Sequence, residues 1–131
     1  MDRSAIRTDR APQAIGPYSQ ALASHGLVFL SGQIGLDPAT GALVTGGTAA
    51  EAEQVLKNLQ AVLAAAGLGF EHVVRTTIYL VDLADFAAVN DVYQRYVREP
   101  YPARATVGVA ALPRGARVEI DAIASGEGLR G

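Results

Sequence analysis

Residues 103–124 read ARATVGVAALPRGARVEIDAIA, two runs of alternating apolar and polar residues around a Pro-Arg-Gly turn. A period of two is typical of β-strands with one buried face, so we expect strands at 103–110 and 117–124 that pair as a hairpin. Because successive side chains of a strand point to opposite faces of the sheet, this pairing would place Arg104 and Glu119 on one face. The apolar side chains would occupy the other face, against helices.

These two charges admit several interpretations. In this register Arg104 is four residues from the level of Glu119, roughly 13 Å along a strand, which is too far for direct contact within one chain. The two side chains could flank a small anion and a water molecule, or each could meet a partner from a neighbouring subunit. A structural ion pair or a solvated surface would also explain the pattern, so the spacing alone leaves these alternatives open.

The composition argues against several classes of protein. Half of the 131 residues are hydrophobic and 18% are charged, and the formal net charge of −2 comes without a block of like charge. Nucleic-acid and anionic-membrane binding depend on clustered Lys and Arg, so neither is expected. The chain has no cysteine, which excludes disulfides, thiolate nucleophiles and Cys-ligated metals. The N-terminus lacks an apolar signal core and no apolar stretch approaches about 20 residues, so a cytoplasmic protein is expected.

Hydrophobic periodicity predicts two helices. Apolar residues follow Thr48 at helical spacing, and Thr48 and Glu51 have the spacing of a capping box, so the first helix is expected to begin at Thr48 and to end before Gly67. A second helix is expected from Asp85 to Val97, ahead of two prolines. Each helix carries an apolar face that must pack on another element.

The remaining apolar runs predict strands. Residues 18–23 and 27–31 are expected to form a hairpin around Ser24-His25-Gly26, residues 73–81 a longer strand, and residues 43–44 are a candidate short strand. The resulting order, ββ(β)αβαββ, indicates an α+β domain with both helices on one face of a mixed sheet.

The chain is expected to form a single domain, residues 1–131, because no repeat or linker divides it. Residues 1–13 are expected to be an irregular arm, and residues 126–131 a flexible tail. Two helices can cover one face of a sheet of five or six strands, while the other face still carries Val, Ile and Tyr side chains. We therefore expect the uncovered face to pack against other subunits.

Three further polar residues are candidates for a site. Tyr18 and Ser31 lie in glycine-containing segments, where backbone N–H groups can approach a ligand, although turn formation explains those glycines equally well. Asn90 falls in the middle of the second helix beside Phe86 and Tyr93, where its amide needs a partner unless it lies at a boundary. The aromatic stripe that includes Phe86 and Tyr93 is expected to be core rather than a platform for stacking bases.

Other chemistries lack the residues they need. His25 and His72 have no metal-ligand spacing with each other or with carboxylates and are expected at the surface or in turns. Ser31 has no histidine placed to activate it. Residues 46–48 precede a helix but lack the lysine of a phosphate-binding P-loop.

Taken in order, the motifs identify the chain as a member of the YjgF/RidA family of reactive-intermediate deaminases, across residues 14–124. The stretch around Arg104 and Glu119 is the most specific part of the resemblance. The matching motifs are IGPYSQA at 15–21, SGQI at 31–34, QVLKNL at 54–59, FAAVNDVY at 86–93, PARATV at 102–107, LP at 112–113 and VEI at 118–120.

The resemblance implies a chorismate-mutase-like protomer of the bacillus type and a homotrimer around a barrel-like sheet core, with ligand sites between subunits. It implies hydrolysis of 2-imino acids, such as 2-iminobutanoate and 2-iminopropanoate, to 2-oxo acids and ammonia, without a cofactor or metal. Arg104 would bind the substrate carboxylate and Glu119 would position or activate water. The residues implied to line the same pocket are Tyr18, Ser31, Asn90 and the main chain at Thr106.

Departures from the family pattern concern substrate preference more than activity. Thr106 replaces a cysteine found in many members, Gly108 stands where a larger and often charged residue is common, and Ala111 replaces a frequent basic residue. The alternative function is a non-catalytic small-carboxylate-binding or regulatory module of the same fold. RNA cleavage, attributed to some relatives, is the least expected, because the chain has neither a basic groove nor a histidine pair.

Overall fold

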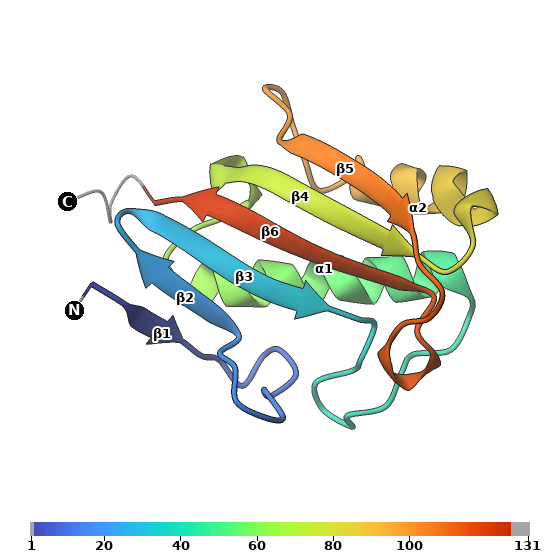
Figure 1. The fold of residues 1–131 in the computed structure, drawn as a ribbon, viewed down its shortest axis with the longest axis horizontal. Helices are drawn as coiled ribbons and strands as arrows, with labels where there is room; N and C mark the ends of the chain where they lie inside the picture. The colour runs from blue at the N-terminus through green and yellow to red at the C-terminus, as the bar shows by residue number, and fades with distance from the viewer. Residues whose placement is uncertain (1, 127–131) are drawn as a thin grey trace.

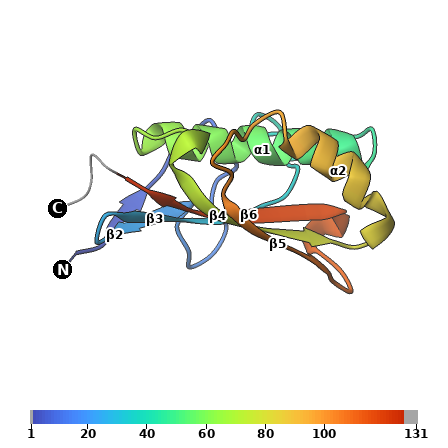
Figure 2. The same ribbon diagram turned by 90° about the horizontal axis from the view of Figure 1, so that it is seen from above.

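The computed structural model describes residues 2–126 as one six-stranded sheet with two helices on the same face (Figure 1). Figure 2 shows the two layers edge-on, helices on one side and sheet on the other. Among the described strands only β4 and β5 run parallel, so the expected α+β architecture with a mixed sheet is confirmed. In chain order the elements are β1 (Ser4–Ile6), β2 (Ala21–Ser24), β3 (Leu27–Gln33), α1 (Thr48–Ala65), η1 (Phe70–His72), β4 (Val73–Leu80), η2 (Leu83–Asp85), α2 (Phe86–Tyr93), β5 (Ala103–Gly108), η3 (Pro113–Gly115) and β6 (Val118–Ser125).

The first predicted hairpin is confirmed. Strands β2 and β3 pair antiparallel, and the two residues between them, His25 and Gly26, have φ angles of 54° and 78°. Positive φ at both positions is the geometry of the two-residue turn that matches the twist of paired strands. The strand expected at 43–44 is reduced to a single bridge between Leu36 and Leu43.

The second predicted hairpin is wrong, because β4 lies between β5 and β6. The strand order is β1-β2-β3-β6-β4-β5, so β6 pairs antiparallel with both β3 and β4, while β5 forms the edge parallel to β4. The alternating pattern correctly indicates two strands, but a period of two does not say which strand is the neighbour. Here α2 makes the crossover that a parallel β4–β5 pair requires.

This strand order separates the two charges that were expected on one face. Arg104 pairs with Thr76, whose buried hydroxyl contacts Tyr93 of α2, so Arg104 lies on the helix side of the sheet. Glu119 pairs with Tyr79 and alternates with the buried Val118 and Ile120, so it lies on the opposite face. The expectation of a shared face within one chain is therefore wrong.

Helix α1 begins at the predicted residue, but its capping box is absent. Gly47 is the N-cap residue, and no side chain caps the helix. Thr48 instead donates its hydroxyl to Asp85 Oδ2 at 2.8 Å and accepts from Arg117 Nε at 2.8 Å, while Glu51 Oε1 accepts from the Arg117 amide at 2.8 Å. Tertiary contacts to η2 and to the residue before β6 have taken the groups that a local cap would use.

Helix α2 ends four residues before the predicted end. After Tyr93 the amides of Arg95 and Tyr96 bond to carbonyls three residues back, which winds the chain more tightly than an α-helix. Val97 stays buried all the same, at 6% exposure. The apolar pattern therefore continues past the helix because the following turns pack on the same core.

The N-terminal segment is more ordered than an irregular arm. It contains the short edge strand β1, and buried Gln20 ties the rest of the segment to the fold. The Gln20 amide donates to the carbonyls of Thr8, Ala11 and Pro12, and its oxygen accepts from the Thr8 amide at 2.7 Å. Of the expected tail, residues 127–131 lie outside the described part of the chain.

The sheet face away from the helices has no covering element in the described chain (Figure 2). Large apolar side chains on it remain accessible, with Phe29 43% and Val107 41% exposed. None of the helices within residues 2–126 has the length and apolar character to cross a membrane.

Replacing the buried glutamine tests the anchor of the N-terminal segment. We expect Gln20→Ala to lower the free energy of unfolding by about 2 kcal/mol, because three backbone carbonyls and one amide lose their partner in a buried place. Urea denaturation at fixed protein concentration measures the change. Gln13→Ala is the matched control, since Gln13 is exposed and a loss below about 0.5 kcal/mol is expected. Equal losses in both variants would contradict the assignment.

Candidate active site

Arg104 projects from β5 toward one face of α2. Its Nη1 donates to Asn90 Oδ1 at 2.7 Å, which supplies the partner that the mid-helix amide was expected to need. The guanidinium carbon lies 5.4 Å from the centre of the Phe86 ring and 5.2 Å from that of Tyr93. A cavity of about 460 Å³ opens beside Arg104, lined also by Asn90, Tyr93, Gln94 and Tyr101.

Arg104 is available to a carboxylate ligand. The side chain is exposed, and among the residues that the structure describes no carboxylate lies within 4.0 Å of it. A guanidinium can bind a carboxylate through two parallel charge-assisted hydrogen bonds. Nη1 is bonded to Asn90, and the remaining N–H groups of the guanidinium can bind a carboxylate.

Glu119 lies in a second cavity, of about 630 Å³, on the opposite face of the sheet. Burial raises the pKa of Glu119 above its ordinary value of 4.5, and the negative charge of Asp121 raises it further. Gly32 of β3 makes room for the carboxyl group, since a Cβ at Gly32 would lie 3.0 Å from Glu119 Cδ and overlap one carboxyl oxygen. A carboxyl group in this setting is a better proton acceptor than an exposed glutamate.

Tyr18 and Ser31 line the Glu119 cavity. The Ser31 hydroxyl donates to the Ser19 carbonyl at 2.6 Å, which fixes the end of β3 to the segment that carries Tyr18. Tyr18 is 54% exposed, and its hydroxyl accepts only a long bond of 3.4 Å from the Ile15 amide. The phenol is therefore free to contact a ligand.

Thr106 shares the face of Arg104, two residues along β5. Its hydroxyl is buried and, among the described residues, has no hydrogen-bond partner. At Gly108, two residues further along β5, a Cβ would lie 3.2 Å from the side chain of Leu83, which is itself 57% exposed. A larger residue at Gly108 would therefore need only a small shift of Leu83, and nothing in the structure explains Gly108 or the exposed Ala111.

The six predicted site residues therefore fall into two groups. Arg104, Asn90 and Thr106 lie on β5 and α2, on the helix side of the sheet, and Tyr18, Ser31 and Glu119 lie around the second cavity. Of the residues lining these two cavities, none is common to both. Each group holds three of the six residues that the family resemblance implies for one pocket.

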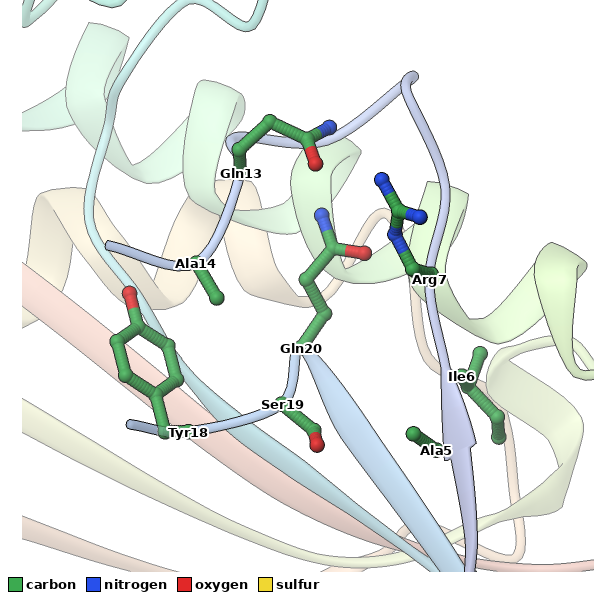
Figure 3. A pocket seen from close by; sticks show the side chains of 8 residues that line it. All are labelled: Ala5, Ile6, Arg7, Gln13, Ala14, Tyr18, Ser19 and Gln20. Atoms are coloured by element: carbon green, nitrogen blue, oxygen red, sulfur yellow. The ribbon is translucent and has the colours of Figure 1, made fainter. Parts of the chain in front are cut away.

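A third cavity, of about 310 Å³, lies in the N-terminal segment (Figure 3). Of the predicted site residues only Tyr18 reaches it, and the Gln20 amide that points into it is already bonded to backbone groups. Neither Arg104 nor Glu119 lines it. In residues 2–126 no three His, Asp or Glu side chains gather in a way that could hold a metal ion.

Sequence reasoning misses Gly32 and the roles of Phe86 and Tyr93. A glycine beside Ser31 is equally typical of a turn, so the sequence alone does not single out Gly32. Phe86, Asn90 and Tyr93 are expected on one face of a helix, and only the position of β5 reveals that Arg104 lies against that face. The helical spacing of these three residues is the available signal for the contact with Arg104. The sequence does not reveal the contact, because the predicted hairpin gives β5 the wrong neighbour.

Comparison with known proteins places the chain in a family. The family model described as endoribonuclease L-PSP matches residues 8–125. Protein DfrA of Myxococcus xanthus is 63% identical over 126 residues, 95% of this chain and 96% of that protein. The 2-iminobutanoate/2-iminopropanoate deaminase of Mus musculus is 55% identical over 122 residues, 93% of this chain and 90% of that protein. RidA from an Antarctic Psychrobacter species superposes with a TM-score of 0.89 at 48% identity, covering 93% of this chain and 98% of that one.

Matches of this extent and identity cover nearly the whole sheet and both helices. They include the strands that carry Arg104 and Glu119 and the helix that carries Asn90. The chain belongs to the YjgF/RidA family.

The raised pKa of Glu119 predicts a pH-dependent stability. The folded state favours the protonated carboxyl group, so the contribution of Glu119 to stability is present below its ordinary pKa and is lost as pH rises through the raised value.

We expect Asp121→Asn to lower the pKa of Glu119, because it removes a like charge. Carbon-13 NMR titration of the Glu119 carboxyl measures this pKa, and Glu71→Gln, an exposed and remote change, is the control. A pKa that stays the same in Asp121→Asn would contradict the expectation.

Proposed function

We propose that this chain is a 2-iminobutanoate/2-iminopropanoate deaminase, which hydrolyses reactive 2-imino acids to 2-oxo acids and ammonia. Family members with that name from Mus musculus and Homo sapiens are 55% and 52% identical to it, over 93% of the chain. The observation that carries the proposal is an exposed arginine that has no carboxylate partner within residues 2–126, together with a glutamate whose pKa burial has raised. One side chain suits the substrate carboxylate and the other suits a reacting water molecule.

Arg104 binds the substrate carboxylate in this mechanism and thereby fixes the position of the imine carbon. Glu119 removes a proton from water as the water oxygen bonds to that carbon, and the protonated Glu119 passes the proton to the imine nitrogen. The product of this step is a carbinolamine. Transfer of its hydroxyl proton to nitrogen, again through Glu119, breaks the C–N bond, releases ammonia and leaves the 2-oxo acid.

Tyr18, Ser31, Asn90 and Thr106 complete the proposed pocket. Asn90 holds one nitrogen of the guanidinium, which leaves the rest of the fork for substrate. The Tyr18 hydroxyl can donate to the carbinolamine, and the main chain at Thr106 can contact the carboxylate. The reaction needs no cofactor or metal, because a water molecule that is held in place and one proton acceptor are sufficient.

We infer that the group of residues around Arg104 and the group around Glu119 meet between subunits of a homotrimer. Within one chain Arg104 and Glu119 lie on opposite faces of the sheet, so one substrate can contact both only if a second copy supplies one of them. The uncovered sheet face, with Phe29 and Val107 accessible, supplies apolar surface for such an assembly. We further propose that each chain is a single domain of the chorismate-mutase-like type, located in the cytoplasm, with no nucleic acid or membrane partner.

Substitution of the two charged residues tests the proposed activity. We expect Arg104→Ala to raise KM for the imine substrate and Glu119→Gln to lower kcat by about 100-fold, in the range of a lost general base. Ammonia release from 2-iminobutanoate generated in the assay measures both. Equal rates for wild type, both variants and buffer would contradict the proposal. Saturable binding of 2-oxobutanoate without turnover would instead favour the non-catalytic carboxylate-binding module.

Mixing the two impaired variants, assayed at substrate concentrations below KM, tests whether sites form between chains. Arg104→Ala and Glu119→Gln, unfolded and refolded together in equal amounts, should recover about one quarter of wild-type activity, because that share of interfaces combines the two intact residues. The control is wild type refolded with a chain carrying both substitutions, where a site within one chain would give about half. No recovery in the first mixture, with half in the second, would place both residues in one subunit.

A further inference from the structure

Three side chains on one face of α2 contact the guanidinium of Arg104. Phe86, Asn90 and Tyr93 follow one another at spacings of four and three residues, which places them on the same side of a helix. Asn90 accepts from Nη1 at 2.7 Å, and the Phe86 and Tyr93 rings lie 5.4 and 5.2 Å from the guanidinium carbon. Both ring distances fall within the range of cation–π attraction.

The Tyr93 ring is itself held in place from the sheet. Its hydroxyl and Thr76 Oγ1 are 2.8 Å apart in a buried hydrogen bond, and Thr76 is the residue of β4 that pairs with Arg104. Tyr93 is 5% exposed, so the ring has little freedom to move. Tyr93, Thr76 and Arg104 are therefore connected, because Tyr93 contacts both Thr76 and Arg104.

Phe86 differs from the rest of the apolar face of α2. The neighbouring positions Val89 and Val92 are 1% and 4% exposed, whereas Phe86 is 37% exposed. The Phe86 ring contacts the Arg104 guanidinium and is not part of the buried hydrophobic core. A ring in this place restrains the cation without neutralising it, unlike a carboxylate.

We propose that Phe86 and Tyr93 are positioning residues for carboxylate binding, because they hold the Arg104 guanidinium in the plane that leaves its free N–H groups open to the ligand. This inference rests on the proposed function for the identity of the ligand. It gives Phe86 and Tyr93, which the sequence pattern places in the hydrophobic core, a role in substrate affinity. Thr76 acts through Tyr93 in the same assignment.

Three variants test the positioning role against one control. Phe86→Leu, Tyr93→Phe and Thr76→Val each remove one restraint, and Tyr96→Phe removes a hydroxyl that contacts Glu53 instead. We expect the affinity for the product 2-oxobutanoate to weaken, and KM for the imine substrate to rise, about three- to tenfold in Phe86→Leu and about two- to threefold in the other two variants. The value of kcat should stay within about twofold, as for a loss of uniform binding. The control should bind like wild type.

Two double substitutions separate positioning from a general structural effect. Tyr93→Phe combined with Thr76→Val should be no worse than either alone, because both remove the same hydrogen bond. In an Arg104→Lys background the effect of Phe86→Leu should fall below about twofold, because a lysine has no planar group to orient. If Phe86 instead has a general structural role, Phe86→Leu will weaken binding as much in the Arg104→Lys background as in wild type. This result would overturn the proposal.

A measurement without ligand separates this inference from the proposed function. The side-chain Nε–H resonance of Arg104, assigned by comparison with Arg104→Lys, should show ring-current shielding that Phe86→Leu reduces and Tyr96→Phe leaves unchanged. If the wild type does not deaminate imines but this shift and the 2-oxobutanoate affinities respond as expected, the proposed function fails and the positioning role stands. If the wild type deaminates imines while Phe86→Leu and Tyr93→Phe keep the wild-type resonance and the wild-type affinity, the positioning role fails and the function stands.

Discussion

The position of β4 between β5 and β6 is the constraint on which the rest of the site depends. Strand β4 has a partner on each side, so it determines which side chains of the two outer strands share a face. Thr76 pairs with Arg104 on the helix side, and Tyr79 pairs with Glu119 on the other. One strand thus separates Arg104 from Glu119 by the thickness of the sheet.

This separation has a chemical consequence for the proposed reaction. Arg104 and Glu119 do not neutralise each other within one chain, so neither the pKa of the carboxyl group is lowered nor the guanidinium occupied by such a pair. On opposite faces, Arg104 keeps a free edge and Glu119 keeps a pKa raised by burial. In the proposed homotrimer, a second copy would bring these two charges to one ligand.

Polar contacts between residues far apart in the sequence, rather than local caps, hold each half of the proposed site in place. Gln20 ties residues 8–12 to the segment that carries Tyr18. On the other half, Thr48 and Arg117 both contact Asp85, the N-cap residue of α2, so the helix that restrains Arg104 is anchored to α1 and to the chain before β6. Gln20 and Thr48 are buried and need these partners, because an unpaired polar group in the interior costs stability.

The sequence by itself determined the elements and the chemistry that they carry. Apolar spacing placed both helices and most of the strands, composition argued against thiol chemistry, and the motifs around Arg104, Glu119 and Asn90 identified the family. The tertiary structure alone decided strand neighbours, the partners of Thr48, and the contact of Arg104 with Phe86 and Tyr93. The physical reason is that side-chain periodicity records only which face of an element is buried. Which element lies against that face depends on chain crossovers and on hydrogen bonds between residues far apart in sequence, and neither leaves a local pattern.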